Sequence, residues 1–160
     1  MKLALLCVGK LKDEAERGIV ARYLERLGPM GAAIGLASAG VSEIMESRAP
    51  APQARKAAEA AELRKRLGAD ARTVALDGRG RMLTSEDLAE TLRRWKDGGA
   101  RQAAFVIGGP DGLDPAFVGD ADLAFSLGRI TLPHGLARAV LAEQLYRAAT
   151  LIAGHPYHRP

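Results

Sequence analysis

The sequence predicts a single α/β domain over residues 1–160, with a mainly parallel sheet covered by helices on both faces. Short apolar runs of strand length alternate with longer helical segments along the chain, a pattern typical of parallel sheets. The run at residues 104–107 carries no polar side chain, which suits a strand buried on both faces. A chain of 160 residues without internal repeats or an evident linker favours one domain.

The first elements are an apolar strand and an amphipathic helix. Residues 3–8 predict a buried strand that Gly9 closes. Residues 13–27 predict a helix that ends at Gly28 and Pro29. Its apolar stripe consists of Ile19, Tyr23, Leu24 and Leu27.

The next segment is less regular. Residues 32–38 predict a second strand, although they are rich in alanine, and residues 39–52 predict a mobile connection containing Gly, Ser and Pro. Residues 53–67 predict an alanine-rich helix capped by Gly68. Its Lys and Arg side chains are expected to form a solvated face, and contact with RNA is the alternative.

The remaining elements continue the alternation of strands and helices. Thr84 or Ser85 is expected to cap a helix that runs to Lys96, because acidic residues occupy its first turn. The other expected elements are a strand at 73–76, a turn at 77–81, strands at 102–107 and 123–126, a short helix at 115–121, an extended piece at 130–132 and a final helix at 134–153.

The strand at 102–107 runs into the sequence Gly-Gly-Pro-Asp-Gly at residues 108–112. Glycines at the carboxyl end of a strand let the backbone turn sharply and let another molecule come close. Ligands of open α/β sheets bind at that edge. We therefore expect a ligand loop here, with a tight turn that binds nothing as the alternative.

Composition excludes several classes of protein. Lys and Arg exceed Asp and Glu by 23 − 19 = 4. By itself, an excess of this size is too small to indicate a protein that binds polyanions. The aromatic content of 4% argues against an RNA-stacking sheet. The one cysteine, Cys7, excludes disulfides within the chain and cysteine zinc sites, and the amino-terminal apolar run is too short for a signal peptide. We expect a soluble, cytoplasmic protein that does not bind a membrane.

The common nucleotide-binding and hydrolase motifs are absent, and the residues that could take part in catalysis or binding are concentrated late in the chain. There is no P-loop, no complete dinucleotide fingerprint and no nucleophile elbow. His134, His155 and His158 lack an accompanying cysteine or carboxylate cluster, so no metal site is expected. Glu143 and Arg147 are spaced to pair on one helix face. The tail at 155–160 offers groups that bind bases and phosphates, with a frayed end as the alternative.

Several motifs in this order resemble the SPOUT-class methyltransferases, and more closely the RlmH family, which methylates N3 of a pseudouridine in 23S ribosomal RNA. The resemblance covers nearly the whole chain. Its motifs are Lys2-Leu3 with Val8-Gly9, Leu76-Asp77 with Gly80 and Ser85, F-V-I-G-G-P-D-G at 105–112, T-L-P-H-G-L-A-R at 131–138, L-A-E-Q-L-Y-R-A at 141–148 and H-P-Y-H-R at 155–159.

The resemblance implies a carboxyl-terminal trefoil knot, a feature that general topology rules treat as nearly absent. It also implies a homodimer whose active sites draw on both subunits, and loops that bind S-adenosylmethionine through backbone groups. The implied cofactor-binding residues are Leu76, Gly108, Leu127, Gly128, Arg129, Ile130, Thr131 and Leu132.

The implied reaction needs alignment of N3 with the methyl group and loss of the N3 proton. The candidate bases are His134, His155 and His158, and the candidate cationic stabilisers are Arg138, Arg147 and Arg159. We expect Tyr157, His158 and Arg159 to position the substrate across the dimer. The implied catalytic set is His134, Arg138, Tyr157, His158 and Arg159.

This chain departs from the family at Gly128, Ile130 and Pro160, and residues 39–52 match it poorly. Two rival hypotheses remain open. One is a dimeric RNA-binding module without catalysis, which would not bind S-adenosylmethionine. The other keeps the enzyme but moves the methyl group to a ribose 2′-hydroxyl or another base. The absence of an appended RNA-binding domain favours an assembled ribosome as the substrate.

Overall fold

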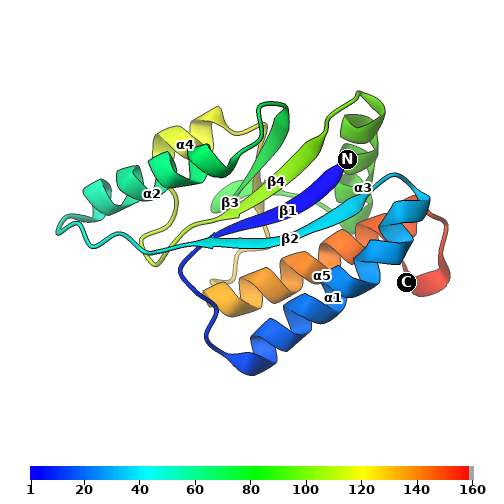
Figure 1. The fold of residues 1–160 in the computed structure, drawn as a ribbon, viewed down its shortest axis with the longest axis horizontal. Coiled ribbons are helices and arrows are strands. Elements are labelled where there is room, and N and C mark those ends of the chain that lie inside the picture. The colour runs from blue at the N-terminus through cyan, green and yellow to red at the C-terminus, as the bar shows by residue number, and fades with distance from the viewer. Residues whose placement is uncertain (159–160) are drawn as a thin grey trace.

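The computed structural model describes residues 1–158 and shows a five-stranded sheet between two layers of helices (Figure 1). The strand order is β2-β1-β4-β3-β5, and every pairing is parallel. The predicted parallel sheet is therefore confirmed, and the carboxyl ends of its strands meet at one edge. The strands are β1 (Lys2–Val8), β2 (Ala37–Ile44), β3 (Ala71–Met82), β4 (Gln102–Ile107) and β5 (Leu123–Ser126).

Helices cover both faces of this sheet, as predicted (Figure 1). One face packs against α1, α3 and α5, and Phe105 of β4 is buried in that core. The other face packs against α2 and α4, and Val106 is buried there. The helices are α1 (Glu14–Ala33), α2 (Pro52–Arg66), α3 (Ser85–Asp97), α4 (Pro115–Asp120) and α5 (His134–Ile152), followed by the 3-10 turn η1 (Pro156–His158).

Local signals account for the elements that were predicted well. β4 and β5 have their predicted bounds. Helix α3 begins with a capping box in which the Thr84 side chain accepts from the Asp87 N–H and the Asp87 carboxylate accepts from the Thr84 N–H. Within residues 1–158, no helix combines the length and apolar character that crossing a membrane requires.

The region between α1 and α2 differs from the prediction. Helix α1 continues through Pro29 to Ala33, so residues 32–33 are helical and the strand expected at 32–38 is wrong. Strand β2 instead occupies Ala37–Ile44, so residues 39–44 of the expected mobile connection are strand. β2 lies at the edge of the sheet and is mostly half-exposed, so it lacks the apolar run that marks the buried strands.

Two further corrections concern the segments near the carboxyl edge. β3 is longer than predicted and is interrupted, since Leu76 and Arg81 both pair with Phe125 while the residues between them leave the ladder. Gly80 allows this crossing, because a Cβ there would lie 2.7 Å from the backbone of Ala124. Residues 130–132 form an irregular link and not an extended strand.

Candidate functional site

A cavity of about 310 Å³ lies at the carboxyl edge of the sheet, between segments of β3 and those at the ends of β4 and β5. Its wall is mainly apolar side chains and backbone, with one carboxylate, Asp77. The residues of β3, at and just beyond the end of its pairing with β4, are Leu76, Asp77 and Gly78; those at and after β4 are Ile107, Gly108, Gly109, Pro110 and Gly112; those from β5 onward are Phe125, Ser126, Leu127, Gly128, Ile130, Thr131, Leu132, His134 and Ala137.

The wall after β4 is a tight turn. The Gly112 N–H donates to the Gly109 carbonyl over 2.9 Å, and Gly112 has a φ of +80°, which favours glycine. A Cβ on Gly108 would lie 2.7 Å from the backbone of Leu113. The turn's own packing therefore requires these glycines, whether or not a ligand approaches them.

The wall after β5 is the irregular link to α5. The Ser126 hydroxyl donates to the Gly128 carbonyl over 2.9 Å, and the Gly128 N–H lies 3.2 Å from the same hydroxyl oxygen. Gly128 has a φ of +133°, which an L side chain rarely adopts, so the backbone of this link favours glycine here. Ile130 is 82% exposed at the rim of the cavity.

The structure brings together the residues predicted to bind a cofactor. All of them line the cavity except Arg129, which is exposed on the same link. Sequence reasoning missed Asp77 and Ser126, although Asp77 follows the last residue of β3 that pairs with β4 and Ser126 ends β5, at the edge where polar residues often meet ligands. A hydrogen bond from Arg79 holds the pKa of the Asp77 carboxyl below its usual range, so Asp77 is ionised at neutral pH.

The residues predicted to be catalytic do not gather in one place within this chain. His134 begins α5, is exposed and lines the cavity. Arg138, one turn later, is only 2% exposed and lies outside the cavity lining. Its guanidinium donates to the carbonyls of Val8 (3.0 Å) and Gly9 (2.8 Å) and to the Glu43 carboxylate (2.6 Å). Arg138 thus ties α5 to the ends of β1 and β2.

Tyr157 belongs to η1, which follows the end of α5 that is remote from the cavity. Its hydroxyl donates to Glu143 over 3.2 Å, and its ring packs edge-on against Tyr146 at 4.7 Å between centroids. Glu143 is about 14 Å along the helix from His134, at 1.5 Å per residue. Burial, reinforced by Tyr23 and Glu143, raises the pKa of the Tyr157 phenol, which stays protonated at neutral pH.

The predicted pair on α5 is present, since the Arg147 Nε donates to the Glu143 carboxylate over 3.0 Å. His158 ends η1, and Arg159 lies outside the described residues. Among residues 1–158, no cluster of three or more His, Cys, Asp and Glu side chains is arranged to hold a metal ion.

A parallel α/β sheet with a cavity at the carboxyl edge of its strands has the architecture in which open α/β sheets usually bind small ligands. A family model described as predicted SPOUT methyltransferase matches residues 1–158. The chain therefore belongs to the SPOUT methyltransferases and, within them, to the RlmH family, and the predicted α/β-knot fold class is confirmed.

The relatives that support this placement match over their full length. Proteins named ribosomal RNA large subunit methyltransferase H from Brucella anthropi and Sinorhizobium fredii are 48% and 49% identical, each with 99% of both chains covered. A solved structure of a probable methyltransferase from Bordetella pertussis has a TM-score of 0.56 at 18% identity, covering 92% of this chain and 95% of its own. That likeness shows the shared fold.

Proposed function

We propose that the protein transfers a methyl group from S-adenosylmethionine to N3 of a pseudouridine in 23S ribosomal RNA, on assembled ribosomes in the cytoplasm. The observation that supports this most is the cavity, because segments distant in the sequence and resembling the family's cofactor loops converge on it. The names of the relatives support the large ribosomal subunit as the source of the substrate.

The lining of the cavity fits S-adenosylmethionine. Its volume is near the lower end of the range for small-molecule sites. Leu76, Ile107 and Leu132 offer an apolar wall for the adenine ring, and the ionised Asp77 offers an acceptor for hydroxyl or ammonium groups. Bound S-adenosylmethionine supplies an activated methyl group.

The chain's own residues then hold the donor, orient the base and accept the N3 proton. His134 is the candidate base, since its imidazole borders the cavity and imidazoles accept protons near neutral pH. Arg138 takes a positioning role in this proposal, because its buried guanidinium holds the start of α5 and with it His134. Tyr157, His158 and Arg159 are the proposed substrate-positioning residues.

A homodimer would bring that tail to a cavity. Tyr157 is anchored about 14 Å along α5 from its own His134, so the tail is better placed to serve a partner's site. Exposed apolar side chains next to the cavity would be covered by a second copy. These are Ile130, Leu136 and Val140.

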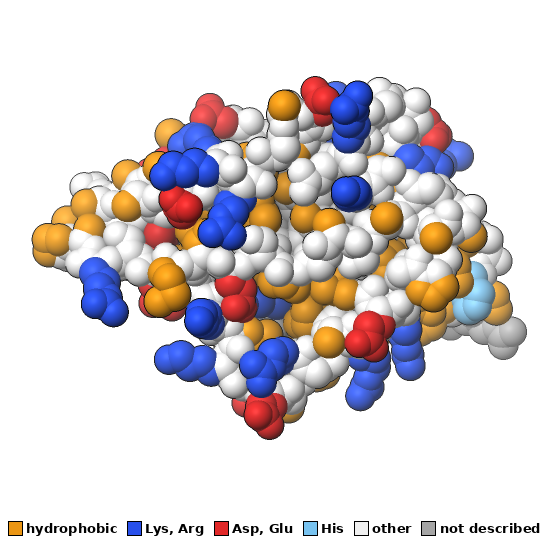
Figure 2. Space-filling view, viewed as in Figure 1, with side chains coloured by type: hydrophobic (Ala, Val, Ile, Leu, Met, Phe, Trp, Pro, Cys, Tyr) orange, Lys and Arg blue, Asp and Glu red, His pale blue; other side chains and the backbone are white. Residues whose placement is uncertain are grey.

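Charge alone does not mark the RNA-binding face. Figure 2 shows basic and acidic side chains interspersed over the face that it presents. A substrate that is large and already folded would compensate for this, since it offers many contacts beyond the target base.

Calorimetric titration with S-adenosylmethionine, followed by mass mapping of modified 23S RNA, tests the proposal. We expect saturable cofactor binding and one methyl group on a pseudouridine base, formed on ribosomes far faster than on naked 23S RNA. Absence of cofactor binding would favour the RNA-binding module, and a methyl group on a ribose would favour the other rival. Equal rates on naked RNA would contradict the ribosomal substrate.

A further inference from the structure

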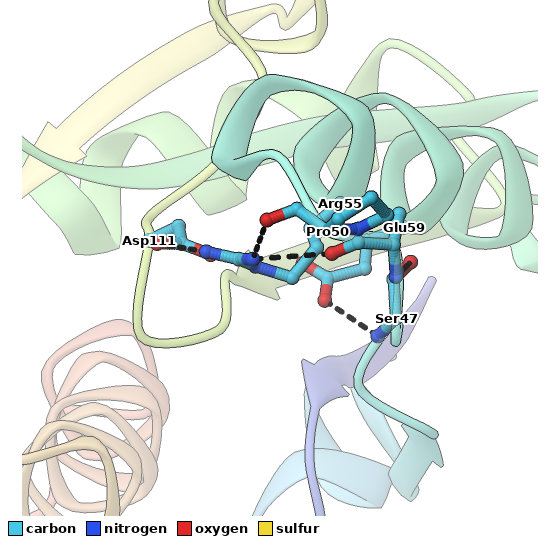
Figure 3. Close-up of polar contacts among 6 residues, drawn as sticks. Ser47, Pro50, Arg55, Glu59 and Asp111 are labelled. Carbon is cyan, nitrogen blue, oxygen red and sulfur yellow. Dashed lines mark hydrogen bonds and ion pairs between the residues drawn. The ribbon is translucent and has the colours of Figure 1, made fainter.

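One arginine of α2 joins two loops that are far apart in the sequence (Figure 3). The Arg55 Nε donates to Asp111 Oδ2 over 2.6 Å, and its Nη2 donates to Asp111 Oδ1 over 3.1 Å. Its Nη1 donates to the carbonyls of Ala49 (3.1 Å) and Pro50 (3.0 Å). The guanidinium therefore binds the carboxylate with two parallel bonds and holds the end of the β2–α2 connection with its remaining edge.

A glutamate on α2, one helical turn after Arg55, strengthens this junction. Glu59 is only 6% exposed, and its carboxylate accepts the Ser47 N–H over 2.9 Å (Figure 3). A Cβ on Gly109 would lie 3.3 Å from Glu59 Oε2, so this carboxylate lies directly beside the cavity turn. Helix α2 thus supports both the 45–51 connection and the 108–112 turn.

The cavity turn depends on Asp111 for its anchoring. Of its five residues three are glycines and one is proline, so Asp111 carries its only polar side chain. Asp111 stands between Pro110 and Gly112, which both line the cavity, while the Asp111 side chain bonds outward to α2. The bonds from Arg55 to Asp111 therefore fix this wall of the cavity without placing a side chain inside it.

We propose that Arg55 and Asp111 are positioning residues that hold the 108–112 turn in the shape that binds the methyl donor, and that Arg55 couples the 45–51 connection to that turn. The inference rests on the proposed S-adenosylmethionine site and adds to it two residues that touch neither donor nor substrate. Preorganisation of this kind raises affinity because the loop's freedom is lost on folding and not on binding. The pair is ionised through neutral pH, since hydrogen bonds from Arg55 lower the pKa of Asp111.

The helix offers a matched control. Arg64 also lies on α2 and pairs with an aspartate 56 residues later, Asp120, at 2.8 Å, but Asp120 belongs to α4 and not to the cavity turn. Arg64→Gln removes an ion pair of the same helix that is more exposed and has a single hydrogen bond, together with the contact of Arg64 with the Phe117 ring, and leaves the cavity wall untouched.

The experiment compares Arg55→Gln, Asp111→Asn and Arg64→Gln by calorimetry with S-adenosylmethionine, by steady-state methylation of ribosomes and by thermal unfolding. We expect the first two to weaken cofactor binding and raise the cofactor KM about tenfold, with kcat at saturating cofactor within about twofold. The Arg64→Gln variant should match the wild type. Arg55→Lys should restore affinity only in part, because an ammonium cannot bind both carboxylate oxygens as the guanidinium does.

The outcomes separate this inference from the proposed function. If the wild type binds the cofactor and Arg55→Gln binds it equally well, the positioning role is overturned while the proposed function stands. If Arg64→Gln weakens binding as much as Arg55→Gln, the effect belongs to helix stability and the inference falls. If the wild type binds no S-adenosylmethionine, the proposed function falls and the inference with it.

Discussion

Cys7 lies on β1 with its side chain fully buried beneath α1 and α5. Burial raises the pKa of its thiol to about 12 from an ordinary value near 9.0. Because only the thiolate is nucleophilic, we expect native protein at pH 8 to leave Cys7 unmodified by a thiol-specific chromogenic reagent. Unfolded protein should react within minutes. Rapid modification of the native protein would mean that the β1 region opens often.

The same shift makes stability depend on pH. A folded-state pKa raised above the unfolded value gives a contribution that is complete below pH 9 and is lost as pH rises toward 12. Between these limits, the free energy of unfolding should fall by about 1.4 kcal/mol per pH unit from this thiol. Urea unfolding at several pH values in that window should give a free energy of unfolding that falls less steeply with pH for Cys7→Ala than for the wild type.

Arg138 and Arg55 show what residue-level reading of a sequence leaves out. Both are arginines on helices; the family resemblance implied a catalytic cation for Arg138, and local pattern predicted a solvated face for Arg55. Their partners, Val8, Gly9 and Asp111, are between 56 and 130 residues away. Burial of an arginine depends on such distant acceptors, so its role becomes visible only in three dimensions.

At the scale of elements, helix α1 continues past a residue pair that normally ends helices. Pro29 lacks an N–H, yet the turn that follows packs Met30 and Ile34 against the core. The Gly31 carbonyl accepts from the N–H groups of Ile34 (3.1 Å) and Leu36 (2.7 Å), which reverses the chain into β2. Packing and this tight ending outweigh the lost hydrogen bond of Pro29.

Two glycines of α1 should respond oppositely to alanine. A Cβ on Gly31 would overlap the Leu36 carbonyl oxygen, whereas a Cβ on Gly28 meets no atom within 4 Å. We expect Gly31→Ala to destabilise the protein by roughly 1–3 kcal/mol through overpacking. Gly28→Ala should stabilise it by about 0.5–1 kcal/mol, because alanine favours helix. Urea unfolding of both variants measures the difference, and stabilisation by both would refute the described reversal.

The buried strand β4 was predictable from its sequence, and the edge strand β2 was not. β4 lies in the middle of the sheet, so every residue after Gln102 in this strand is apolar and its bounds are clear. β2 has neighbours on one side only, and its Ala, Ser and Gly residues resemble a loop. The segments predicted to bind a cofactor were chosen from the family resemblance, since irregular links such as 127–133 carry no periodic signal of their own.

At the scale of the whole molecule, helix α5 begins beside the cavity and ends beside the tail. A knotted arrangement of the last segments is a property of the fold class and leaves no periodicity in the sequence. A single chain leaves an apolar surface uncovered beside the cavity. This surface includes Leu136 and Val140, which are one turn apart on α5. Two copies that met through this surface would bring each tail toward the other's cavity.

A pair of valines tests the proposed dimer. Val140 on α5 is 38% exposed beside the cavity, and Val41 on β2 is 39% exposed at the far edge of the sheet. A buried, unpaired carboxylate is costly, so Val140→Glu should shift sedimentation from dimer to monomer and lower ribosome methylation at least tenfold. Its affinity for S-adenosylmethionine should change far less, if the cavity is formed within one chain.

The Val41→Glu variant should remain a dimer with normal activity, because an equally exposed valine outside the interface tolerates a charge. A wild-type protein that sediments as a monomer at micromolar concentration would contradict the dimer directly. Monomeric Val140→Glu with full methylation would show that one chain completes its own site. In that case Tyr157, held by Glu143 in the single chain, would serve to fasten the tail and not to position a base.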